Sequence, residues 1–198
     1  MKAVLISIQP KWCELIASGK KTVEVRKTKP KIETPFKCYI YCTIDKRLLH
    51  KFDKGERVDD EHFFDKHVFV RQNTWIRGHF NPNKKVIGEF VCDEISDYTK
   101  AFFDEQEERD TDDIARFIYH SQIKYADLCS YVGLKDFYGW HISDLVIYDK
   151  PKELSEFQQC HKCKHNCVRT HQNVELCKYH RLTRPPQSWC YVEELKGE

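Results

Sequence analysis

The sequence predicts an α+β fold, and three observations support that prediction. A β-α-β pattern occupies the first 26 residues, further strand-like runs follow along the chain, and helices and strands do not alternate regularly. A doubly wound parallel sheet would need regular alternation. The 198 residues fit one domain with additions, because a chain of this length already buries roughly 70% of its surface around a single core.

The N-terminal segment predicts a strand followed by a short helix. Val4–Ile8 is a β-prone run, and Gln9-Pro10 ends it in a way that suits a helix entered at proline. Three apolar residues then have the i, i+3, i+4 spacing of one buried helix face, namely Trp12, Leu15 and Ile16. Gly19 closes the helix, because glycine best tolerates a left-handed cap.

After Gly19 the period of the sequence changes to two. In an extended backbone, Val23 and Val25 would point into the core. Thr22, Glu24 and Arg26 would then share the opposite face of the strand. This polar face is the first candidate for a functional surface.

Four later runs also predict strands. Phe36–Ile44 is rich in β-branched and aromatic residues. Val86–Ile95 contains Gly88, which predicts a bulge or a close approach of backbones. Trp140–Tyr148 and Ser188–Val192 complete the set.

Two helices are expected between the strands, to pack against them. Asp112 and Asp113 favour the start of the first, whose apolar residues are Ile114, Phe117, Ile118 and Ile123. Tyr125–Gly133 predicts a second, shorter helix. Residues 45–83 lack a regular pattern and are interpreted as an elaborated connection.

The composition predicts a cytoplasmic protein without a membrane span. Hydrophobic residues make up 40% of the chain and charged residues 32%, and no run approaches the roughly 20 apolar residues of a transmembrane helix. Met1-Lys2 leads directly into a strand-like run that is too short for a signal peptide. Ten cysteines in a reducing compartment predict buried or metal-bound thiols in place of disulfides.

Charge is unevenly distributed, although the formal net charge is only +2. Residues 1–31 contain eight Lys/Arg and two acids, whereas residues 101–113 contain seven acids and one Arg. A basic half can hold a phosphate backbone through Coulomb attraction and counterion release. Solvated faces that maintain solubility explain the charge pattern equally well.

Residues 160–180 predict a metal site, since they contain four of the ten cysteines and four of the ten histidines. Cys160-x-x-Cys163 has the spacing with which two thiolates bind one Zn²⁺, and Cys167 and Cys177 can complete a structural tetrahedral Cys₄ site. The alternative ligands are His161, His165, His171 and His180. A loop with reduced thiols is the competing interpretation. Six Lys/Arg in residues 160–184 would let the segment extend a nucleic-acid surface or simply keep it soluble.

Gly19–Arg26 resembles the Gly-x-Lys-x-x-Glu-x-Arg signature of the ASCH domain family. The resemblance continues at Trp140–Leu145, Pro151–Leu154 and Pro186–Val192. It implies a PUA-like mixed β-barrel with flanking helices, formed by residues 1–157 and 185–198 and interrupted by residues 158–184 as a zinc-binding insertion.

The resemblance also implies a cleft lined by Lys21, Glu24 and Arg26, with Lys20 and Thr22 beside it, that binds RNA or a nucleotide. Arg26 suits this role because its planar fork can grip a phosphate or a base edge, while Lys21 adds a point charge. The simpler alternative is a surface salt bridge, which would be worth at most about 1 kcal/mol.

Two other function classes remain open at this stage. The segment also resembles small bacterial ASCH amidohydrolases that act on N4-acetylcytidine, for which Lys21 and Glu89 match a lysine and a glutamate. Glu24 occupies the position of their threonine nucleophile and Thr22 lies two residues early, so Glu24 would instead act as general base on water, with Lys21 stabilising the oxyanion. A protein-interaction module is the third class, and nucleic-acid or nucleotide binding is the favoured one.

Overall fold

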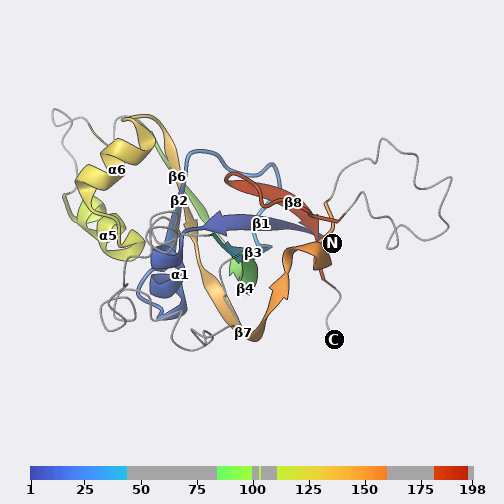
Figure 1. Cartoon of the computed structure of the whole chain (residues 1–198). Coiled ribbons are helices and arrows are strands. Elements are labelled where there is room, and N and C mark those ends of the chain that lie inside the picture. Colours follow the sequence, from blue (N-terminus) through green and yellow to red (C-terminus); the bar gives the residue numbers. More distant parts are fainter. Residues whose placement is uncertain (44–83, 100–102, 104–110, 160–180, 196–198) are drawn as a thin grey trace, which may run out of the picture. The chain divides into compact units, whose positions relative to one another are not determined.

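Figure 1 shows the computed structural model, which describes residues 1–43, 84–99, 103, 111–159 and 181–195. Its strands are β1 (Lys2–Ile8), β2 (Val23–Arg26), β3 (Phe36–Cys42), β4 (Lys85–Cys92), β5 (Ile95–Tyr98), β6 (Phe137–His141), β7 (Ser143–Glu153) and β8 (Trp189–Glu193). Its helices are α1 (Pro10–Ala17), α5 (Thr111–Ser121) and α6 (Tyr125–Val132), with a 3₁₀ turn, η2, at Leu154–Glu156. No helix among these residues is long and apolar enough to cross a membrane.

The strands form two sheets. A five-stranded sheet has the order β7-β4-β3-β1-β8, and a three-stranded sheet has the order β2-β6-β5. The larger sheet is mixed, because β1 pairs with β3 in parallel and with β8 antiparallel. The α+β prediction is therefore confirmed. The barrel is not, because neither strand order closes on itself within the described residues.

The chain divides into two compact units, and four elements run across their boundaries. The first unit comprises Met1–Glu14, Lys37–Glu89 and Val146–Glu198, and the second comprises Leu15–Phe36 and Phe90–Leu145. The boundaries fall within α1, β3, β4 and β7.

The first unit is built around β1, whose six residues after Lys2 are all buried. A central strand that is covered on both faces has such a continuous apolar sequence. The core cluster contains Ala3, Leu5, Tyr39, Tyr41, Val86, Phe157, Leu182 and Val192. At Gly88 a Cβ atom would lie 2.4 Å from the carbonyl oxygen of Val146, so the predicted close approach of backbones is confirmed.

The second unit contains the three-stranded sheet, and α5 packs against β2 (Figure 1). Its core includes a group of packed aromatic rings. The ring of Phe137 lies 4.9 Å from that of Tyr98 and 5.5 Å from that of Phe117, measured between centroids. Trp140 is completely buried and meets the ring of Phe36 edge-on at 5.9 Å.

Two of the predicted strands are wrong as single elements. Val86–Ile95 divides into β4 and β5, and Trp140–Tyr148 divides into β6 and β7. In both cases the halves belong to different sheets. The second break occurs at Ile142, whose N–H donates to the carbonyl of Thr22, and is followed by Asp144 at a left-handed φ of 45°. An alternating pattern does not reveal such a switch, because both halves keep the period of two.

The predicted helices need one small correction. Tyr125–Gly133 forms α6 and its Gly133 cap. The preceding helix, α5, ends at Ser121, and Gln122 has a left-handed φ of 56°. Ile123 is buried, but it lies in the link between the helices and not in α5. The connection predicted for residues 45–83 lies outside the described residues.

Candidate functional site

The end of α1 determines where Lys21 lies. Gly19 has φ of 71°, and its N–H donates to the carbonyl of Ile16 at 2.9 Å. The N–H of Lys21 donates to the carbonyl of Leu15, also at 2.9 Å. A Cβ at Gly19 would meet no atom within 4 Å, so the glycine is required by its backbone angle and not by space. The left-handed glycine expected from the sequence is present.

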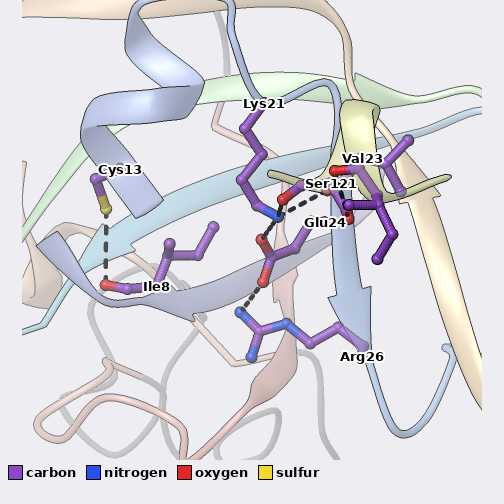
Figure 2. Close-up of polar contacts among 8 residues, drawn as sticks. Ile8, Cys13, Lys21, Val23, Glu24, Arg26 and Ser121 are labelled. Carbon is purple, nitrogen blue, oxygen red and sulfur yellow. Dashed lines mark hydrogen bonds and ion pairs between the residues drawn. The ribbon is translucent and has the colours of Figure 1, made fainter. Parts of the chain in front are cut away.

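Three charged side chains converge beside β2, as Figure 2 shows. Glu24 Oε2 lies 3.4 Å from Lys21 Nζ, and Glu24 Oε1 lies 3.0 Å from Arg26 Nη2. Glu24 and Arg26 are two positions apart on the strand and so share a face, while Lys21 reaches them from the turn before β2. The carboxylate therefore lies between two cations. We call these three side chains the charged cluster.

The charged cluster is buried, which excludes the surface salt bridge considered above. The exposed fractions of the side chains are 3% for Lys21, 8% for Glu24 and 7% for Arg26. Lysine, glutamate and arginine are almost never buried to this extent unless they are paired. Removing each ion from water costs several kcal/mol. The charged cluster therefore carries a large desolvation penalty in the second unit.

The ammonium group of Lys21 has further partners. It donates to the carbonyl of Val23 at 2.8 Å and to the carbonyl of Ser121, at the end of α5, at 2.6 Å. Burial lowers the pKa of Lys21 from 10.5, while the carboxylate of Glu24 acts in the opposite direction. Lys21 therefore releases its proton more readily than an exposed lysine does.

Thr22 joins the start of β2 to the end of α5. Its Oγ1 lies 2.9 Å from Nδ1 of His120, and its N–H donates to the carbonyl of His120 at 2.9 Å. Its own carbonyl accepts a hydrogen bond from the N–H of Ile142 at 2.9 Å. These contacts hold the charged cluster against α5. Lys20, the preceding predicted ligand-binding residue, is exposed.

Glu89, the other candidate catalytic carboxylate, belongs to the first unit. Its Oε1 lies 2.9 Å from Nζ of Lys37, and its Oε2 accepts a hydrogen bond from the hydroxyl of Tyr148. Lys37 also contacts Glu194 at 3.4 Å. Burial raises the pKa of Tyr148, and the neighbouring Glu89 raises it further. These contacts join three strands and the segment after β8, and the catalytic role of Glu89 stays a prediction.

His120 and Ser121 were not predicted as site residues. Both contribute backbone carbonyls to the site, and any residue type can supply a carbonyl. Each lies about 100 positions from its partner in the sequence. No local pattern could have indicated them. The eight predicted zinc ligands between Cys160 and His180 lie outside the described residues.

A comparison with protein families decides the identity of the fold. The family model described as the ASCH domain matches residues 6–165. The chain belongs to the ASCH domain family. This family is PUA-like and RNA-associated.

Solved structures of ASCH proteins agree with this assignment. The crystal structure of ASCH from Zymomonas mobilis has a TM-score of 0.52 and 17% identity, covering 97% of this chain and 88% of that one. A serine-to-alanine variant of the same protein has a TM-score of 0.53 and 16% identity, with 97% and 89% covered. A tyrosine-to-phenylalanine variant has a TM-score of 0.53 and 16% identity, with 98% and 92% covered. At this level of identity the likeness shows a shared ASCH fold. No curated protein matches this ASCH chain.

Proposed function

We propose that this ASCH protein binds RNA or a modified nucleotide at the charged cluster. The observation that carries the proposal is the burial of Lys21, Glu24 and Arg26 within one six-residue segment. A fold gains little from such an arrangement, because replacing a buried ion pair with apolar residues is often neutral or stabilising. Costly buried charge is more easily explained by binding than by stability.

The three groups have complementary roles in this proposal. The guanidinium of Arg26 offers a planar fork that suits a phosphate or the edge of a base. Lys21 adds a compact positive charge. Glu24 lies between them, where it holds both cations in position and can accept a hydrogen bond from the amino group of a base.

Exposed residues of the same segment support a polyanionic ligand. Lys20 and Lys27 flank the charged cluster in the sequence and are both exposed. Such groups attract a phosphate backbone at long range. The PUA-like, RNA-associated character of the family points to the same class of ligand.

Fluorescence anisotropy with a labelled single-stranded RNA tests the proposal. We expect the affinity of the wild type to fall as salt rises, because bound phosphates release counterions. Arg26→Lys keeps the charge but loses the fork, and should weaken binding by roughly 5- to 150-fold, the equivalent of about 1–3 kcal/mol. Circular dichroism spectra will verify that the variant is folded.

Lys85→Ala is the matched control, because it removes a cation that pairs with Glu153 in the first unit. Its binding should equal that of the wild type within about twofold. An affinity for RNA that changes neither with salt concentration nor in Arg26→Lys would contradict the proposal and favour a protein-interaction module.

A second candidate function is hydrolysis of N4-acetylcytidine or a similar modified nucleoside. The observation in its favour is the lowered pKa of Lys21, caused by burial, beside a carboxylate at 3.4 Å. Glu24 would take a proton from water as the hydroxyl oxygen attacks the acetyl carbon. Lys21 would stabilise the oxyanion, and the protonated Glu24 would return the proton to the leaving amine, which yields cytidine and acetate.

Chromatography of reactions with N4-acetylcytidine separates the two functions. Formation of cytidine by the wild type but not by Lys21→Met would support the enzyme. Glu89→Gln tests whether the second carboxylate takes part. If the wild type binds RNA but leaves N4-acetylcytidine intact after prolonged incubation, binding is the function that remains.

A further inference from the structure

Tyr131 is a partly exposed aromatic residue in the last turn of α6. Leu128 and Val132 of the same helix are buried, with exposed fractions of 0% and 2%, and anchor α6 to the core. The exposed fraction of Tyr131 is 39%. Gly133 then ends the helix in a left-handed conformation, and its N–H donates to the carbonyl of Cys129 at 2.9 Å. The ring is therefore carried on a fixed piece of backbone.

The same ring lies beside the segment that holds the charged cluster. Nζ of Lys27, the residue after Arg26, lies 4.9 Å from the centre of the Tyr131 ring. Burial raises the pKa of Tyr131, with the charges of Arg26 and Glu24 acting in opposite directions. The phenol therefore lies within the electrostatic field of the cluster.

A structural role alone explains Tyr131 poorly. More than a third of the residue is exposed, so burial of the ring contributes only part of what a core tyrosine would. A cation over an exposed ring adds about 0.5–1 kcal/mol. In contrast, an accessible aromatic face beside cations is what proteins use to bind single-stranded nucleic acid.

We propose that Tyr131 is a stacking platform for an unpaired nucleobase, with Lys27 holding the adjoining phosphate. The base would stack on the aromatic face, and its edge would meet the charged cluster. This inference deepens the proposed function and rests on it. It specifies a ligand with an unpaired base that can stack on the tyrosine ring. It excludes a duplex, whose bases are stacked on one another.

Three RNA probes test this inference by fluorescence anisotropy: a labelled single-stranded oligouridylate, the same strand in a duplex, and an abasic strand of equal length. The wild type should bind the single strand more tightly than either of the others. Tyr131→Ala should weaken binding of the single strand by roughly 5- to 150-fold, as expected for one stacked base. It should leave binding of the abasic strand unchanged.

Two further variants sharpen the test. Tyr131→Phe keeps the ring and should restore most of the affinity that Tyr131→Ala loses. Tyr125→Ala removes a tyrosine of similar exposure, 42%, from the same helix, and should bind like the wild type. Lys27→Ala should reduce the slope of log affinity against log salt concentration by about one, because one phosphate contact is lost.

The outcomes distinguish this inference from the proposed function. If Tyr131→Ala binds the single strand as tightly as the wild type while Arg26→Lys binds it more weakly, the stacking platform alone is overturned. Equal affinity for the single strand and the abasic strand would also overturn it. Failure of the wild type to bind any of the RNA probes would overturn both the stacking platform and RNA binding as the proposed function.

Discussion

At the scale of single residues, Glu24 holds the candidate site together, because its carboxylate contacts both Lys21 and Arg26. All three side chains are more than nine-tenths buried. Without the carboxylate, two buried cations would face each other with no anion between them. The energetic consequences of changing each residue are therefore unequal.

Glu24→Gln should lower the free energy of unfolding by about 3–5 kcal/mol, because removing one partner leaves buried charge uncompensated. Urea denaturation will measure the change. Asp97→Asn is the matched control, since Asp97 pairs with Lys29 at 2.8 Å in the same unit but has a side chain that is 57% exposed. It should cost at most about 1 kcal/mol. Similar losses of unfolding free energy in the two variants would show that the charged cluster contributes no more to stability than an exposed ion pair.

The lowered pKa of Lys21 predicts a dependence of stability on pH. As pH rises through that lowered value towards 10.5, the folded protein releases a proton that the unfolded chain still holds. The stability of the wild type should therefore rise relative to that of Lys21→Met over this interval. Urea denaturation of both proteins from pH 7 to pH 10.5 will measure the difference. A constant difference, or one of the opposite sign, would contradict the burial of a charged Lys21.

The residue pattern predicted part of this site. Alternation in Thr22–Arg26 correctly placed Glu24 and Arg26 on one face. The same pattern was interpreted as a polar functional surface, whereas both side chains are buried. The reason is that burial depends on what packs over the strand, and α5 contributes Ser121 from about 100 residues away. Local alternation carries no information about such a partner.

At the scale of secondary-structure elements, the close contact between β4 and β7 depends on Gly88. A Cβ there would lie 2.4 Å from the carbonyl oxygen of Val146 and 3.1 Å from Cα of Ile147. Both contacts are with backbone, which cannot rotate away. The two strands must therefore separate if any side chain is added.

Gly88→Ala should lower the free energy of unfolding by about 3 kcal/mol, at the upper end of the range for overpacking. Thermal and chemical denaturation will measure the loss. Val146→Ala changes a side chain that is 51% exposed at the same crossing, and should cost less than about 1 kcal/mol. The close approach would be refuted if Gly88→Ala were as mild as this control.

Elements were predicted well where one pattern matches one element. β1, α1, β2, β3, α6 and β8 all lie where the periodicity and the turn residues indicated. Within the described residues, the errors are the two runs that change sheets, at Asp93-Glu94 and at Ile142, and the end of α5, which stops at Ser121 before Ile123. A strand that changes its partner keeps its alternating sequence, so only the pairing reveals the break.

At the scale of the whole molecule, the described residues on either side of 160–180 pair with each other in the first unit. The N–H of Leu182 donates to the carbonyl of Phe157 at 2.9 Å, and Gln158 forms an isolated bridge with Arg181. Phe157 and Leu182 also belong to the same core cluster. The residues that flank the segment are therefore already held together.

Replacing residues 160–180 with a short Gly/Ser linker should preserve the fold, because a few residues can connect two paired positions. The melting temperature and the circular dichroism spectrum should remain close to those of the wild type when zinc is absent from both. Loss of a cooperative transition would show that the segment is part of the core fold.

We further propose that the same segment binds one structural Zn²⁺ through Cys160, Cys163, Cys167 and Cys177, with His161, His165, His171 and His180 as alternatives. Elemental analysis of the purified wild type should find one zinc per chain. The linker variant and Cys160→Ser/Cys163→Ser should contain none. A chelator should lower the melting temperature of the wild type and leave that of the linker variant unchanged. Substoichiometric zinc in carefully prepared wild type would refute the site.

The sequence by itself determined the α+β class, the ASCH signature at Gly19–Arg26 and the glycine positions that the backbone requires, because these depend on local conformation and spacing. Only the tertiary structure decided that the charged cluster is buried, that Ser121 contacts Lys21 and His120 contacts Thr22, and that two continuous runs divide between sheets. These features arise from contacts between residues distant in the chain. Such contacts depend on which surfaces the fold brings together, and no local pattern of residues records them.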